Sequence, residues 1–176
     1  MKKIFKNIQF EAVKGDISKQ PDVEAVVNAA NAQLQTGGGV AGAIHRAAGT
    51  ELYKECRNLA PIKPGEAVIT KAYNLPNDYV IHCLRPIYGH DSPEEKLLAN
   101  CYKNALRLAE KHQIKSVAFP SLSTGAFGYP IEEAVNVTFN AILAELEGLE
   151  HLQRIKFVLF SEQDLKRYLK KIEDLK

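Results

Sequence analysis

Short apolar runs alternate along the chain with longer stretches of helical periodicity. Turn residues bound the apolar runs, which predict strands over residues 8–13, 23–27, 67–72, 79–84, 117–119 and 155–160. Apolar positions at helical spacing predict helices over residues 38–48, 51–59, 93–112, 131–147 and from 162 onward. Strands that alternate with helices favour a mostly parallel sheet with helices on both faces. We therefore expect an α/β fold, a three-layer α/β/α sandwich with a mixed, mostly parallel central sheet, in which strands near Ile8 and Lys71 could pair antiparallel.

Three helix ends carry recognisable signals. Gly49 is expected to stop the first helix, because glycine tolerates the backbone conformation that ends helices. Ser92 is expected to cap the third helix, with Pro93 at its first position and Glu95 three residues after the cap. Ser161 is expected to cap the last helix.

The composition is that of a soluble globular protein with one domain spanning residues 1–176. Hydrophobic residues make up 45% and charged residues 25% of the chain. The 23 basic and 21 acidic residues nearly balance, which argues against a dedicated nucleic-acid surface. The basic run at residues 166–171 is interpreted as the solvated face of a terminal helix. No leader and no segment of roughly 20 apolar residues is found, so we expect a cytoplasmic monomer with no membrane partner.

The cysteines and histidines do not predict a metal site. Cys56, Cys83 and Cys101 are scattered and odd in number, which is typical of buried thiols in a reducing compartment. His82 and Cys83 would point to opposite faces of a strand, which disfavours a shared metal. His45 is interpreted as a helix-packing residue bonded to backbone. We expect no metal and no cofactor.

Two glycine-rich turns are the most informative local feature. They occupy residues 36–42 and 123–128, and each follows an apolar run and precedes a predicted helix. A helix start presents unpaired N–H groups and partial positive charge, and glycine lets a ligand approach the backbone closely. Two such turns in one domain predict a ligand with two linked phosphates.

A nicotinamide dehydrogenase is the first alternative, because Gly37, Gly39 and Gly42 match the G-x-G-x-x-G spacing. That fingerprint expects its first glycine directly after the strand, whereas nine residues, 28–36, intervene here. It also leaves the second glycine turn unexplained. Asn28 and Asn31, at the end of a predicted buried strand, could satisfy turn backbone or bind a ribose diol.

Four segments of the chain resemble the macrodomain family. They are GDI at residues 15–17, VNAAN at 27–31, GGGV at 37–40 and PSLSTGAFGYP at 120–130, and the resemblance covers nearly the whole chain. It implies a three-layer α/β/α domain that binds ADP-ribose or ADP-ribosylated protein. It further implies hydrolysis of ADP-ribose linked to protein, acetate or phosphate.

The resemblance also implies roles for particular residues. Asp16 would accept the adenine amino group, the Ile17 backbone would contact the ring, and Phe160 would pack on it. The two glycine turns would donate to the two phosphates, Asn31 would orient the distal ribose as the catalytic residue, and Phe127 would wall the ribose. The complete predicted ligand-binding set is Asp16, Ile17, Asn28, Asn31, Gly38, Gly39, Val40, Ser123, Thr124, Gly125, Ala126, Phe127 and Phe160.

Two positions depart from the family's patterns. One branch places a catalytic aspartate where this chain has Ala41, and other branches place a histidine where this chain has Thr36. Because a general base contributes roughly 10²–10⁴ in rate, we expect a slow hydrolase. The alternative is a non-catalytic reader of ADP-ribose.

Overall fold

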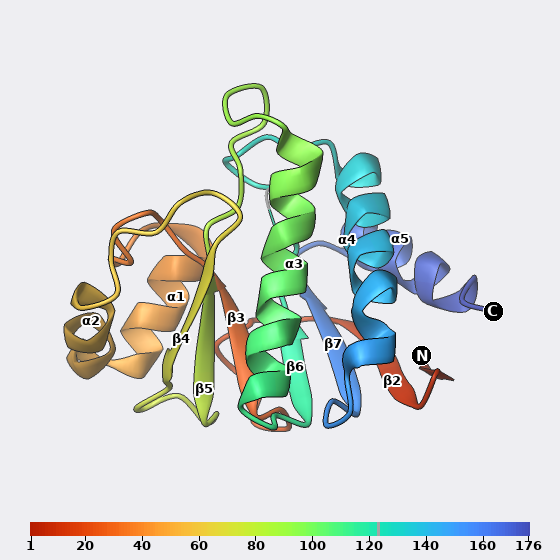
Figure 1. The fold of residues 1–176 in the computed structure, drawn as a ribbon, viewed down its shortest axis with the longest axis horizontal. Helices are drawn as coiled ribbons and strands as arrows, with labels where there is room; N and C mark the ends of the chain where they lie inside the picture. The colour runs from red at the N-terminus through yellow and green to blue at the C-terminus, as the bar shows by residue number, and fades with distance from the viewer. Residues whose placement is uncertain (123) are drawn as a thin grey trace.

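The computed structural model describes residues 1–122 and 124–176, so Ser123 lies outside the described residues (Figure 1). The strands are β1 Lys2–Phe5, β2 Ile8–Lys14, β3 Ala25–Ala29, β4 Ala67–Lys71, β5 Tyr79–Cys83, β6 Ser116–Phe119 and β7 Arg154–Leu159. The helices are α1 Gly39–Ala48, α2 Thr50–Arg57, α3 Glu94–Lys111, α4 Ile131–Glu145 and α5 Glu162–Glu173. A 3₁₀ turn, Leu146–Gly148, follows α4.

The strands form one seven-stranded sheet in the order β1-β2-β7-β6-β3-β5-β4. The inner strands pair in parallel, whereas β1 pairs antiparallel with β2 and β4 pairs antiparallel with β5. The expected mixed, mostly parallel sheet is confirmed, with its antiparallel pairs at the two edges. The strand near Ile8 is antiparallel only to β1, a short edge strand that the pattern did not predict, and runs parallel to β7.

Helices cover both faces of the sheet, which confirms the three-layer sandwich (Figure 1). One core contains Ile81 and Cys83 of β5 together with buried side chains of α3, α4 and α5. The other contains Val80 of β5 and the buried side chains of α1 and α2. Alternate residues of one strand therefore serve the two cores, as the period of a strand requires.

The predicted helix ends are partly correct. Gly49 ends α1, and the Ser161 hydroxyl accepts a hydrogen bond of 3.1 Å from the Asp164 amide. The expected cap at Ser92 is wrong, because Pro93 itself is extended (φ −79°, ψ 121°) and occupies the cap position before Glu94. The fourth helix, expected to reach residue 147, ends at Glu145 and continues as the 3₁₀ turn.

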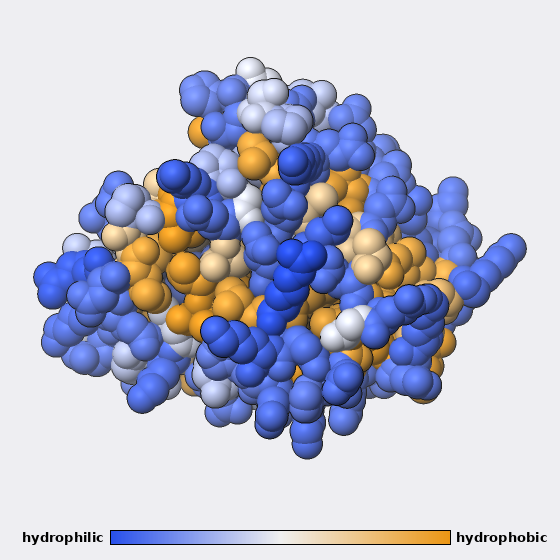
Figure 2. All heavy atoms as spheres, in the orientation of Figure 1, coloured by the Kyte–Doolittle hydropathy of each residue, from blue (hydrophilic) through white to orange (hydrophobic). Residues whose placement is uncertain are grey.

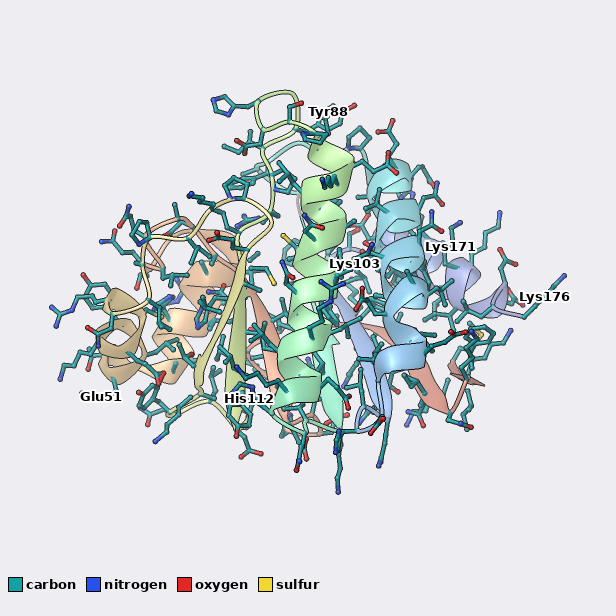
Figure 3. The ribbon with its side chains drawn as sticks, in the orientation of Figure 1. Glu51, Tyr88, Lys103, His112, Lys171 and Lys176 are labelled. Carbon is teal, nitrogen blue, oxygen red and sulfur yellow. The ribbon has the colours of Figure 1, made fainter. Side chains whose placement is uncertain are left out.

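The surface in this orientation is mainly hydrophilic, with apolar side chains visible across its middle (Figure 2). Lys171 and the C-terminal Lys176 extend from the region of α5, while Tyr88 and His112 lie at opposite ends of α3 (Figure 3). The three cysteines are buried and free, as expected. None of the described helices combines the length and apolar character needed to cross a bilayer.

Candidate functional site

The two glycine turns follow two neighbouring parallel strands of the sheet. The first follows β3 and the second follows β6, and these strands are parallel neighbours with Val26 opposite Ala118. The carboxyl ends of parallel strands share one edge, which is where α/β sheets bind ligands. Both turns therefore follow strands whose carboxyl ends meet at the same end of the sheet.

The first turn presents an uncapped helix start. Gly38 occupies the N-cap position of α1 in an extended conformation (φ −81°, ψ 177°). Because glycine has no side chain, no side-chain cap accepts hydrogen bonds from the N–H groups that follow. No acidic residue lies in the first turn of α1. Gly39 has φ +55°, which favours glycine strongly. The free N–H groups and the helix dipole together suit an anion.

Gly42 allows this turn to close against the helix. An ideal Cβ on Gly42 would lie 2.3 Å from the Gly37 carbonyl oxygen. By contrast, nothing lies within 4 Å of an ideal Cβ on Gly38 or Gly39. The three glycines therefore have different roles. Gly42 allows the Gly37 carbonyl to pack against α1, and Gly38 and Gly39 leave space for a ligand beside the backbone.

Asn31 lies half-buried beside this turn. Its Oδ1 accepts from the Gln35 amide at 2.9 Å, and its Nδ2 donates to the Gln35 carbonyl at 2.8 Å. An ideal Cβ on Gly37 would lie 3.4 Å from Nδ2, so the carboxamide is at the edge of the glycine turn. A carboxamide has two donors and two acceptor lone pairs, so one of each is left for a ligand.

The second turn is closed by a hydrogen bond from the Gly128 amide to the Gly125 carbonyl at 3.0 Å. Gly128 has φ +73°, and no atom of the described residues lies within 4 Å of an ideal Cβ on Gly125. The Thr124 hydroxyl donates to Ser121 Oγ at 3.0 Å. Ala126 is exposed in the turn, and Phe127 is half-buried.

Arg85 links the segment just after β3 to the second turn, and the sequence did not single it out. Its Nη1 donates to the Ala30 carbonyl at 2.6 Å, one residue before Asn31. Its guanidinium carbon lies 3.8 Å from the centroid of the Phe127 ring. Burial lowers the pKa of Arg85 to about 10, so the side chain remains a cation at neutral pH. The backbone of the following loop adds a bond from the Tyr88 amide to the Phe127 carbonyl at 3.0 Å.

Three other predicted residues gather where β2 and β7 end. The Gly15 amide donates to the Leu159 carbonyl at 3.0 Å, which brings the segment of Asp16 next to Phe160. Phe160 is 92% exposed, an unusual position for a large aromatic side chain. Asp16 Oδ1 accepts from the Ser18 hydroxyl at 2.7 Å and from its amide at 2.9 Å, and these bonds lower the pKa of Asp16. Ile17 is buried in the core.

Asn28 and His45 lie in the interior. Asn28 is fully buried, its Nδ2 lies 3.0 Å from His82 Nδ1, and its Oδ1 has no partner among the described residues. Burial lowers the pKa of His82 to about 3 and also lowers that of His45. The expected backbone bond of His45 is wrong, because neither ring nitrogen has a partner among the described residues.

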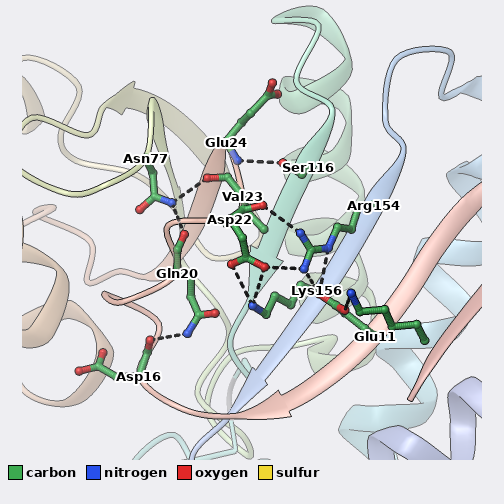
Figure 4. A network of polar contacts seen from close by, with 11 residues as sticks. Glu11, Asp16, Gln20, Asp22, Val23, Glu24, Asn77, Ser116, Arg154 and Lys156 are labelled. Carbon is green, nitrogen blue, oxygen red and sulfur yellow. Dashed lines mark hydrogen bonds and ion pairs between the residues drawn. The ribbon is translucent and has the colours of Figure 1, made fainter.

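The segment that leads from Asp16 to β3 is held by hydrogen bonds from side chains to its backbone carbonyls (Figure 4). Gln20 Nε2 donates to the Asp16 carbonyl at 2.8 Å. Asn77 Nδ2 donates to the carbonyls of Gln20 and Val23, each at 2.8 Å. These bonds fix the backbone that carries Asp16 to the edge of the sheet.

An ion-pair network anchors the same segment (Figure 4). Asp22 pairs with Lys156 Nζ at 3.0 Å and with Arg154 Nη2 at 2.5 Å. Arg154 also pairs with Glu11, which is buried in the middle of β2. Burial alone would raise the pKa of Asp22, but hydrogen bonds from Lys156 and Arg154 outweigh it and lower the pKa to about 2.

We expect Asp22→Asn to lower the melting temperature at pH 7 and to lose part of the acid sensitivity. A carboxylate with a depressed folded pKa stabilises the fold above its unfolded pKa, and this stabilisation is lost as the pH falls. For Asp22 the window runs from the ordinary value of 3.8 down to about 2. Melting curves should show that the difference in melting temperature between the variant and the unchanged protein becomes smaller as the pH falls through this window. A constant difference would contradict the role of the charge.

The chain is similar to known proteins. A family model described as Macro domain matches residues 27–138. A macro domain-containing protein of Chlorobaculum tepidum is 45% identical over 93% of this chain and 95% of its own length. Human ADP-ribose glycohydrolase MACROD2 is 49% identical over 92% of this chain, which spans only 38% of that longer protein.

Solved structures show the same fold. The macrodomain of Oceanobacillus iheyensis with ADP has a TM-score of 0.91 and 42% identity, covering 98% of this chain and 94% of that one. The macrodomain of Trypanosoma brucei in complex with ADP-ribose has a TM-score of 0.84 and 35% identity, covering 93% of this chain and 68% of that one.

Proposed function

The chain belongs to the macrodomain family, and we propose that it binds ADP-ribose and slowly hydrolyses ADP-ribosyl linkages. The observation that carries this proposal is the pair of glycine turns at the ends of the neighbouring strands β3 and β6. The solved relatives with ADP and ADP-ribose support the ligand, and the glycohydrolase relative supports the activity.

In the proposed complex, ADP-ribose extends along the carboxyl edge of the sheet. Phe160 packs on adenine, Asp16 accepts its amino group and the backbone of Ile17 contacts the ring. The exposed N–H groups of Gly38, Gly39 and Val40 face one phosphate, and the turn that contains Thr124, Gly125, Ala126 and Phe127 faces the other. Ser123, predicted to belong to this turn, lies outside the described residues.

The proposed chemistry uses the ligand's own phosphate. A water held between the α-phosphate and the loop near Ala41 attacks the anomeric or the acyl carbon, and the phosphate helps to deprotonate it. Asn31 fixes the distal ribose, and the dipoles of the loops stabilise the negative charge that develops. Without a side-chain base the rate should be lower by roughly 10²–10⁴ than in an enzyme that has one.

A non-catalytic reader of ADP-ribose is the second candidate. The observation that favours it is Ala41, whose methyl group in the first turn of α1 cannot accept a proton. Both candidates bind ADP-ribose, so only turnover distinguishes them.

Two measurements test the proposal. Calorimetry should show tight binding of ADP-ribose and negligible binding of NAD. Release from mono-ADP-ribosylated protein and from O-acetyl-ADP-ribose should exceed that of Asn31→Ala. Binding of ADP-ribose without release above this control would support the non-catalytic reader. Absence of binding would overturn both the hydrolase and the reader.

Replacing the exposed aromatic ring should weaken binding without loss of stability. Phe160→Ala removes a side chain that is 92% exposed, so the melting temperature should not change. Stacking of a base on an aromatic ring is worth roughly 1–3 kcal/mol, so affinity for ADP-ribose should fall about 5- to 150-fold. The matched control is Ile4→Ala on β1, a side chain that is 73% exposed. Equal affinities for both variants would contradict the adenine contact.

A further inference from the structure

Arg85 carries a charge that the chain itself does not neutralise. Within the described chain its only hydrogen bond is the one to the Ala30 carbonyl, which leaves its other N–H groups available. Burial and two thiols, Cys83 and Cys101, are the influences on its pKa, and no carboxylate contributes. A guanidinium presents five donors that match the oxygens of a carboxylate or phosphate. Arg85 is a half-buried cation without an acidic partner among the described residues, at the end of the sheet where the ligand is proposed to bind. Such a cation suits an anionic group of a bound ligand.

Its position is specific within the site. The Ala30 carbonyl places the guanidinium next to Asn31, and the ring of Phe127 lies against its carbon at 3.8 Å. Asn31 and Phe127 are the two residues assigned above to the distal ribose. The free donors of Arg85 are therefore near the end of the ligand that carries the cleaved group, not near adenine.

We propose that Arg85 is a specificity-determining residue that binds the oxygens of a phosphate or acyl group attached to C1″ of the distal ribose. This rests on the proposed ADP-ribose site. The shared chemistry of the preferred substrates is a carboxylate or phosphate leaving group, whose oxygens the guanidinium can bind in pairs. Amine-type or alkoxide-type linkages gain less from this cation, because their leaving atoms do not offer two charged oxygens.

The step that Arg85 assists balances as a hydrolysis. The oxygen of water bonds to C1″, and the bond from C1″ to the carboxylate oxygen breaks with its electron pair. The products are a hemiacetal hydroxyl on the ribose and a free carboxylate, and one proton of the water passes by way of the α-phosphate to solvent. Arg85 stabilises the charge on the departing oxygens and does not itself transfer a proton, because it stays protonated at neutral pH.

Calorimetry with three ligands tests this without turnover. The ligands are ADP, ADP-ribose and ADP-ribose-1″-phosphate, which differ only at the distal end. The unchanged protein should bind the 1″-phosphate about tenfold or more tightly than ADP-ribose, since charge-assisted bonds to a guanidinium are strong. Arg85→Gln should abolish this preference while leaving affinity for ADP within about twofold. Arg85→Lys should restore part of it, which a purely structural role of the stacked guanidinium would not allow.

Hydrolysis then tests the inference with two carboxylate sources. Release of acetate from O-acetyl-ADP-ribose and release of ADP-ribose from glutamate-modified protein should both fall in kcat for Arg85→Gln. The matched control is Arg107→Gln, which breaks an ion pair between Arg107 of α3 and Glu145 at the end of α4. Three results would overturn the inference: no preference for the 1″-phosphate, a preference that survives Arg85→Gln, or an equal loss of ADP affinity, which would place Arg85 on the diphosphate. Failure of the unchanged protein to bind ADP-ribose would instead refute the proposed function.

Discussion

Ala41→Asp is expected to raise hydrolysis on the order of 10²-fold or more, because a positioned general base contributes roughly 10²–10⁴ in rate. Ala41 lies in the first turn of α1 and is 5% exposed. An ideal Cβ on Gly37 would be 3.8 Å from its methyl group, so the position borders the first glycine turn. A carboxylate there would be stabilised in its ionised form by the helix N-terminus and could take a proton from water. The measurement is kcat with O-acetyl-ADP-ribose and with mono-ADP-ribosylated protein.

Ala41→Asn is the matched control. It has nearly the same shape as the aspartate but does not titrate, so it reports the steric effect alone. Affinity for ADP-ribose should be measured for both variants, since a new carboxylate close to the diphosphate also repels it. If the aspartate and asparagine variants turn over at the same rate, the water is activated elsewhere and the missing base does not limit this protein.

The position of the glycine turns could be predicted only in part. Each turn is local, so its place after a strand and before a helix follows from residues 36–42 and 124–128. Their proximity depends on the pairing of β3 with β6, which are separated by β4, β5 and three helices along the chain. Nothing local specifies that pairing. The family resemblance implied only that both turns bind one ligand, and the structure supplies the pairing of the two strands.

The residues that were missed or misjudged share a dependence on distant partners. Arg85 follows an ordinary strand, and its importance comes from Ala30 and Phe127, far away along the chain. His45 was expected to find a backbone partner, but its ring is buried 6.5 Å from the ring of His82 and neither of its nitrogens has a partner among the described residues. Local patterns report which residues are polar, and only tertiary packing decides which polar groups are left unpaired.

The edge strand β1 was missed for a different reason. It has four residues whose burial alternates between exposed and intermediate, so no strongly apolar run marks it. The backbone hydrogen bonds of β1 come from its pairing with β2, and this pairing cannot be read from the composition of β1. Ser92 illustrates the limit of a cap signature, since Pro93 beside it occupies the N-cap position of α3 without a capping side chain.

Gly42→Ala is expected to destabilise the protein and to abolish most binding of ADP-ribose. The new Cβ would lie 2.3 Å from the Gly37 carbonyl oxygen and 2.9 Å from Arg46 Nη1. The arginine side chain can move away, but the carbonyl belongs to the turn itself, so the backbone of the turn must shift. Alanine favours a helix over glycine by about 1 kcal/mol, and overpacking costs typically 1–3 kcal/mol. The cost of the clash should exceed the gain in helix propensity, because the methyl group meets backbone atoms of the turn and not a flexible side chain.

Gly38→Ala isolates the clash from the general effect of adding a methyl group. Nothing lies within 4 Å of an ideal Cβ on Gly38, and its φ of −81° suits any residue, so its melting temperature should not fall. For Gly42→Ala, each 1 kcal/mol lost should lower the melting temperature by roughly 2–4 °C. Affinity for ADP-ribose should fall more than about tenfold, because the displaced turn no longer aims its N–H groups at one phosphate. A more stable Gly42→Ala variant with full affinity would show that the turn does not lie against α1, and the proposed phosphate site would lose its foundation.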